Sequence, residues 1–124
     1  MRLPPRLPDH GTIALIAPAG PIELDAEAAS GWFRERGYTL RIYPGVGLAQ
    51  GYLAGSDQAR LQDLHDAFAD PEVDAILCLR GGYGTPRLLD KIDFALLGRH
   101  PKPFVGYSDI TALHLAIARH AGFV

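Results

Sequence analysis

Ile13-Ala14-Leu15-Ile16-Ala17 and Ala75-Ile76-Leu77-Cys78-Leu79 are two continuously apolar runs. Runs of this kind suit strands that are buried on both faces of a parallel sheet. A third run, Thr39-Leu40-Arg41-Ile42-Tyr43, alternates between apolar and polar residues, which predicts a strand at the edge of that sheet. A fourth apolar run begins at Phe104. The runs start roughly thirty residues apart, a spacing that leaves room for a helix after each strand.

Helical periodicity fills the intervals between these runs. The first interval has one apolar helix face and ends at Gly37, and the second opens with the capping pair Ser56-Asp57 and ends before Pro71. The residues of the two faces are Ile22, Ala26, Ala29 and Phe33 in the first, and Leu61, Leu64 and Phe68 in the second. Strand and helix in alternation predict an α/β fold, a three-layer parallel sheet with right-handed crossovers. The flavodoxin-like strand order 2-1-3-4 fits this pattern.

Composition indicates one globular domain. The chain has 124 residues, of which 48% are hydrophobic and 21% charged, and a net charge of −2. We expect a loose leader over residues 1–10 and a folded domain over residues 11–124. The charge indicates no nucleic-acid partner, and no apolar run approaches the roughly 18 residues of a membrane span. The N-terminus has no apolar signal core, so we expect a cytoplasmic protein. The single cysteine, Cys78, excludes a disulfide within the chain and a thiolate metal site.

The run Phe104-Val105-Gly106-Tyr107-Ser108-Asp109-Ile110-Thr111 passes abruptly from a strand pattern to a helical one. A serine at such a turn presents its hydroxyl beside the first N–H groups of the helix, where an oxyanion would find donors. Ser108 is therefore a candidate nucleophile. The turn taken alone favours the other interpretation, a helix cap, because serine is a preferred N-cap residue. The G-x-S-x-G elbow of α/β-hydrolases does not match, since Ile110 stands at its last glycine.

Two glycine-rich segments are further candidates. The segment Arg80-Gly81-Gly82-Tyr83-Gly84-Thr85 follows the third strand, and its N–H groups could face an oxyanion, bind a phosphate, or merely form a turn with positive φ. Arg87 stands where a G-x-G-x-x-G motif needs its last glycine, which argues against a nucleotide site. The stretch from Gly45 to Gly55 could be a lid over the site or a plain connector.

No residue of the chain is a credible base for Ser108. A serine nucleophile is activated by a neighbouring group, most often a histidine. His114 lies six residues along the following helix, about 9 Å of rise away from the turn. The other histidines fall on helices, a surface turn or the leader, and no set has the spacing of metal ligands. They are His10, His65, His100 and His120.

Four motifs together resemble the LD-carboxypeptidases of serine peptidase family S66, the muramoyltetrapeptide carboxypeptidases of bacterial murein recycling. The similarity runs from about Gly11 to Val124 in the family's order and spacing. The motifs are Ile13 to Gly20; Ser56-Asp57 with Arg60 and Leu64; Arg80-Gly81-Gly82-Tyr83-Gly84; and Gly106-Tyr107-Ser108-Asp109-Ile110-Thr111-Ala112-Leu113. The resemblance implies a flavodoxin-like or class I glutamine amidotransferase-like fold.

The resemblance also implies a site. Ser108 would be the nucleophile, and Gly82 and Asp109 would donate the N–H groups of the oxyanion hole. Arg80, Tyr83 and Tyr107 would bind substrate, and neither a metal nor another cofactor is implied. A second domain, absent from these residues, would supply the Glu and His of a Ser-Glu-His triad.

The implied reaction releases the terminal D-alanine of a murein tetrapeptide. We also expect a homodimer. Two alternatives stay open: a microcin-immunity peptidase of the same family, and a non-catalytic module that binds an anion.

Overall fold

The computed structural model describes residues 1–124 and contains one four-stranded sheet. Its strands are β1 (Thr12–Ile16), β2 (Thr39–Ile42), β3 (Ala75–Cys78) and β4 (Phe104–Val105). They lie in the order β2-β1-β3-β4, and every neighbouring pair is parallel. The predicted strand order is confirmed, and the alternating strand β2 lies at an edge, as its pattern indicated.

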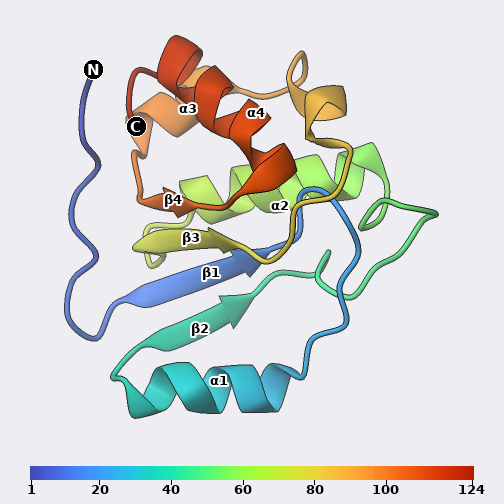
Figure 1. Ribbon diagram of the computed structural model, residues 1–124. Helices are drawn as coiled ribbons and strands as arrows, with labels where there is room; N and C mark the ends of the chain where they lie inside the picture. The colour runs from blue at the N-terminus through green and yellow to red at the C-terminus, as the bar shows by residue number, and fades with distance from the viewer.

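Helices cover both faces of the sheet, which confirms the predicted three-layer architecture. The helices are α1 (Ala26–Glu35), α2 (Asp57–Ala69), α3 (Phe94–Arg99) and α4 (Thr111–Ala116). Helix α1 lies on one side of the sheet, and α2, α3 and α4 lie on the other (Figure 1). Short 3₁₀ turns occupy Thr85–Leu88 and Ser108–Ile110, and α4 continues into a π-helical turn, Ile117–Ala121. None of these helices combines the length and apolar character needed to cross a membrane.

The burial of strand β1 explains why its sequence is apolar from Ile13 onward. Ala14 and Ile16 belong to the larger core cluster, which includes Phe68 of α2. Ile13 and Leu15 point to the other face and form the smaller cluster, against which Phe33 of α1 packs. Because successive side chains of a strand point to opposite faces, a strand covered on both sides needs an apolar residue at every position.

The helix boundaries follow from caps. The Asp25 carboxylate accepts a hydrogen bond from the Ala28 N–H at 2.9 Å, so α1 begins at Ala26. Ile22 lies before the helix, and the prediction that it shares the helix face is wrong. Ser56 caps α2 as predicted, its hydroxyl accepting from the Ala59 N–H at 3.0 Å.

The two ends of the chain meet. Residues 1–10 form no helix and only an isolated parallel bridge, between Arg2 and Phe123. The Arg2 N–H donates to the Gly122 carbonyl oxygen at 3.0 Å, and the Val124 N–H donates to the Arg2 carbonyl oxygen at 3.2 Å. Figure 1 shows both termini on the α3 side of the molecule.

Candidate active site

Three loops meet at the carboxyl ends of β1, β3 and β4. The Gly20 N–H, from the loop after β1, donates to the Gly81 carbonyl oxygen at 2.9 Å. A Cβ atom placed on Gly81 would lie 2.8 Å from the Ser108 Cβ and 3.1 Å from its Oγ. Contacts this short require glycine, because real Cβ atoms do not approach so closely. The loop after β3 therefore packs its backbone directly against Ser108.

Ser108 occupies a strained position. Its φ is +57°, in the left-handed region that residues other than glycine, asparagine and aspartate seldom adopt. The residue is exposed, and its hydroxyl makes no hydrogen bond within the chain. The capping interpretation of Ser108 is wrong: Tyr107 is the N-cap residue of the following 3₁₀ turn, and no side chain caps it. What remains is an unpartnered hydroxyl on a sharp turn between β4 and α4, the geometry of a nucleophile elbow.

Gly82, the residue after Gly81 in the same loop, has a free donor. Its φ is +112°, which is accessible only to glycine at low cost, and its N–H makes no hydrogen bond within the chain. Asp109 follows Ser108 and joins the two loops. Its carboxylate Oδ2 accepts from the Thr85 N–H at 2.9 Å, and its carbonyl oxygen accepts from the Thr85 hydroxyl at 2.7 Å. The Asp109 side chain thereby fixes the glycine-rich loop relative to the Ser108 turn.

Arg60, a buried arginine, contacts the loops after β1 and β3. Arg60, on α2, is 1% exposed. Its Nη1 donates to the carbonyl oxygens of Pro18 at 2.8 Å and Gly84 at 3.0 Å, and its Nη2 pairs with Asp57. Burial lowers the pKa of the Arg60 guanidinium, and the Asp57 carboxylate opposes that shift. Arg60 thus ties the loop after β1 to the loop after β3, a role that sequence reasoning did not assign to it.

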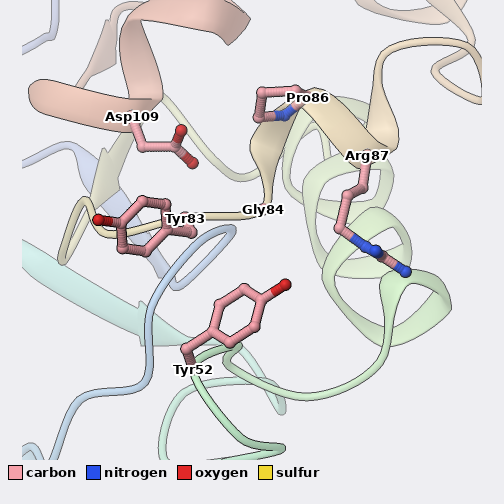
Figure 2. Close-up of a pocket in the computed structure, with 6 residues that line it drawn as sticks. All are labelled: Tyr52, Tyr83, Gly84, Pro86, Arg87 and Asp109. Carbon is pink, nitrogen blue, oxygen red and sulfur yellow. The ribbon is translucent and has the colours of Figure 1, made fainter.

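A pocket of about 510 Å³ opens beside Asp109. Its lining, shown in Figure 2, consists of Tyr52, Tyr83, Gly84, Pro86, Arg87 and Asp109. Tyr83 and Asp109 were predicted as site residues, and both line it. Tyr52, Pro86 and Arg87 were missed as site residues. Tyr52 belongs to the stretch from Gly45 to Gly55, for which the sequence allows a lid or a connector. Its ring meets that of Tyr83 edge to face, with 5.9 Å between the ring centroids.

That loop is attached to the domain at two points. The buried Asp63 carboxylate accepts from the Gly45 N–H at 2.7 Å, and the Ala54 N–H donates to the Ala19 carbonyl oxygen at 2.8 Å. Burial raises the pKa of Asp63, and the Gly45 hydrogen bond opposes that shift. The two attachments fix both ends of this loop to the domain.

Two other predicted substrate residues lie outside the pocket lining. The Arg80 Nη1 donates to the Pro21 carbonyl oxygen at 2.6 Å, which directs this guanidinium toward the loop after β1. Tyr107 precedes Ser108 and is 65% exposed. Arg87, by contrast, lines the pocket while its Nε and Nη2 each lie 2.9 Å from an Asp57 carboxylate oxygen. Those hydrogen bonds hold the pKa of Asp57 below its ordinary value.

Three of the five histidines have hydrogen-bond partners away from Ser108. His65 Nε2 accepts from the Asp93 N–H at 3.0 Å, and His114 Nε2 lies 3.1 Å from the Phe104 carbonyl oxygen. His10 Nδ1 lies 3.1 Å from the Gly37 carbonyl oxygen. None of these contacts brings an imidazole to the Ser108 hydroxyl, in line with the sequence analysis.

The structure also contains no group of three or more potential metal ligands. Cys78 is buried, and burial raises the pKa of its thiol well above the ordinary value, which makes it an inert core residue.

Comparison with known proteins gives one consistent family. The family model of the LD-carboxypeptidase N-terminal domain matches residues 13–124. A probable murein peptide carboxypeptidase of Bacillus subtilis is 44% identical over 98% of this chain and 38% of its own length. A murein tetrapeptide carboxypeptidase of Pseudomonas aeruginosa is 42% identical over 91% of this chain and 38% of its own length. The chain thus spans about two fifths of the length of these relatives.

Solved structures agree with this result. A MccF-like protein from Bacillus anthracis superposes with a TM-score of 0.90 at 35% identity, over 98% of this chain and 38% of its own. A muramoyltetrapeptide carboxypeptidase from Oxalobacter formigenes superposes with a TM-score of 0.76 at 35% identity, over 88% of this chain and 37% of its own.

Proposed function

The chain belongs to the LD-carboxypeptidase family, peptidase S66, and from this premise we propose that it carries the nucleophile of a serine carboxypeptidase acting on murein tetrapeptide. The observation that supports the proposal is Ser108 itself. It is an exposed serine at φ +57°, its hydroxyl is unpartnered, and the glycine-rich loop after β3 packs against it. A strained turn of this kind presents a hydroxyl to a substrate and leaves room for a tetrahedral intermediate.

In the proposed reaction, Ser108 Oγ attacks the carbonyl carbon that precedes the terminal D-alanine. The negative charge that develops on the carbonyl oxygen is received by the N–H groups of Gly82 and Asp109. The Gly82 N–H is unpartnered in the chain, so it can donate without breaking an existing bond. Collapse of the intermediate breaks the C–N bond and releases D-alanine, and water then hydrolyses the acyl-enzyme.

A base must accept the Ser108 proton and deliver it to the leaving amine. We place this base outside residues 1–124, in a histidine oriented by a glutamate, as the family resemblance implies. The basis is that His10, His65 and His114 each have a partner elsewhere in the chain. Residues 1–124 alone are then expected to release no D-alanine, whereas the full-length protein does so.

The remaining assignments rest on the same resemblance. Tyr83 lines the pocket beside Asp109 and is the substrate residue best supported by its position, with Arg80 and Tyr107 contributing from the neighbouring loops. We further propose that the protein works in the cytoplasm as a homodimer in murein recycling, without a metal or other cofactor.

Release of D-alanine from murein tetrapeptide by the full-length protein tests the proposal. Ser108→Ala should abolish turnover while the tetrapeptide still binds, because only the attacking oxygen is lost. Ser30→Ala, on α1, is the matched control and should keep the parental rate. Unchanged turnover in Ser108→Ala would refute the assignment of the nucleophile.

The microcin-immunity reaction is a second candidate, since a MccF-like structure superposes over nearly the whole chain. The same two variants should therefore be assayed with an aminoacyl sulfamoyl nucleoside and with its hydrolysable peptidyl-nucleotide counterpart. Cleavage of the peptidyl nucleotide but not of the tetrapeptide would select this alternative. Binding of the tetrapeptide and of the peptidyl nucleotide, without cleavage of either, would favour a non-catalytic module.

A further inference from the structure

Thr85 is a buried polar residue whose hydroxyl bonds outside its own turn. Its exposed fraction is 0%, and it is the first residue of the 3₁₀ turn Thr85–Leu88. A threonine hydroxyl commonly bonds to the backbone of its own turn. Here Gly84 is the N-cap residue, and no side chain caps the turn. The Thr85 hydroxyl donates instead to the carbonyl oxygen of Asp109 at 2.7 Å, and so joins two loops that are distant in sequence.

Thr85 and Asp109 are joined by a second hydrogen bond in the opposite sense. The Asp109 Oδ2 accepts from the Thr85 N–H at 2.9 Å. Figure 2 shows the Asp109 carboxylate directed toward the ribbon between Gly84 and Pro86. Thr85 therefore holds both the side chain and the carbonyl group of Asp109. Because both are bonded to the same Cα atom, fixing them fixes the direction of the third bond, from Cα to the amide nitrogen.

The amide group of Asp109 is left free by these contacts. Its N–H makes no hydrogen bond within the chain, and neither does the N–H of Gly82, the other proposed oxyanion donor. Gly82 precedes Thr85 in the loop after β3, whereas Asp109 lies on the turn after β4. The Thr85–Asp109 pair thus links the two segments that carry the donors. Such donors stabilise a transition state only when they are held in place before the charge develops.

We infer that Thr85 is a positioning residue: its hydroxyl holds the Asp109 N–H in the direction in which it meets the oxyanion formed on attack by Ser108. This inference rests on the proposed function. Thr85 acts through Asp109 and does not touch the substrate, since it is fully buried. The Thr111 N–H also donates to the Asp109 carbonyl oxygen, so loss of the Thr85 hydroxyl leaves that oxygen with a donor. The fold should therefore survive this loss while the oxyanion hole becomes less rigid.

The test compares Thr85→Val and Thr85→Ser in the full-length protein. Valine has the shape of threonine without the hydroxyl, and serine keeps the hydroxyl. The substrate is murein tetrapeptide or the peptidyl nucleotide, whichever the parent cleaves. Thr85→Val should lower kcat by about 10- to 100-fold, because a displaced donor costs less than a missing one, which costs about 10²–10³. KM should stay close to the parental value, since the lost interaction is made only in the transition state.

Rescue by serine separates positioning from a merely structural role. Thr85→Ser should keep most of the parental kcat, although it lacks the buried methyl group. A parental kcat in Thr85→Val, a raised KM with kcat unchanged, or an equal loss of kcat in both variants would each overturn the inference. Thr39→Val, at the exposed start of β2, is the matched control and should keep the parental kcat.

Crystal structures of the same full-length variants give a readout that does not depend on turnover. Asp109 should be displaced or adopt more than one orientation in Thr85→Val, and should keep its position in Thr85→Ser. An Asp109 that is unmoved in Thr85→Val would overturn the inference even if the parent were inactive. A parent that cleaves neither substrate, with Asp109 displaced in Thr85→Val, would count against the proposed function and not against positioning by Thr85.

Discussion

Replacing Ser108 by glycine and, separately, by alanine measures the strain of the proposed nucleophile. Both variants remove the hydroxyl, and they differ only in the Cβ atom. At φ +57° that Cβ is unfavourable, because an L-residue in the left-handed region costs roughly 1–2 kcal/mol. Glycine escapes this cost but has a more flexible unfolded chain, which offsets about 0.5–1 kcal/mol.

The difference leaves the glycine variant more stable than the alanine variant by about 0.5–1 kcal/mol. At an ordinary helical position the sign is opposite, since glycine is there about 1 kcal/mol less favourable than alanine. The two cases are therefore separated by roughly 1.5–2 kcal/mol. A glycine variant that is more stable than the alanine variant, and that has no activity, would show that the conformation of Ser108 destabilises the fold while presenting the hydroxyl that activity needs.

Urea unfolding of the two variants, followed by circular dichroism, is the assay. With a slope of about 1–3 kcal/mol/M, the glycine variant should unfold at a midpoint higher by a few tenths of a molar unit, with an unchanged slope. The matched substitutions at Ser30, within α1, should show the opposite order: Ser30→Ala should be more stable than Ser30→Gly. A Ser108→Gly variant less stable than Ser108→Ala would falsify the argument from backbone strain.

Three further changes test the surroundings of the site. Gly81→Ala should destabilise the fold by about 1–3 kcal/mol and slow D-alanine release by at least about tenfold, because the new Cβ meets the Ser108 side chain; a parental rate would contradict this. Arg60→Met should cost about 3 kcal/mol in urea unfolding, because it leaves the carbonyl oxygens of Pro18 and Gly84 without their buried donor and removes one of the two arginine partners of Asp57; a change below about 1 kcal/mol would argue against that role. Asp63→Asn should be at least as stable as the parent at neutral pH. Burial raises the folded-state pKa of Asp63, so its favourable contribution is present below the ordinary value of 3.8 and is lost as pH rises through the raised value. The stability of the parent relative to Asp63→Asn, measured by thermal unfolding, should therefore increase as the pH falls from 7 toward 4. The opposite trend would contradict a raised pKa of Asp63.

Local patterns were sufficient to predict the sheet. The continuously apolar runs at β1 and β3 indicate burial on two faces, and the alternating run at β2 indicates burial on one. Burial determines whether a strand lies at the centre or at the edge of a layered fold. Helix ends were predicted where a cap is visible, as at Ser56, and misplaced where two starts were possible. Asp25 is such a case: its carboxylate caps α1, and the periodic residue Ile22 is left outside the helix.

The site was predicted only in part, since its chemistry depends on backbone conformation. The sequence marks Ser108 as a serine at a turn, and both a cap and a nucleophile fit that description. Only its φ of +57° and the absence of a capping bond separate the two. In the same way, the glycines of the loop after β3 indicate conformational freedom, but not that Gly81 must touch Ser108.

The pocket and Arg60 were beyond sequence reasoning for a different physical reason. The partners of Arg60 are mostly main-chain carbonyl oxygens, which every residue has, so no side-chain pattern announces them. Tyr52 and Tyr83 come from loops of different strands and meet only because the parallel sheet brings both loops to one edge. Neither the hydrogen bonds of Arg60 to the main chain nor the contact between two loops that are distant in sequence produces a periodic pattern in the sequence. The elements that most directly shape this site are thus the ones that a single sequence conceals.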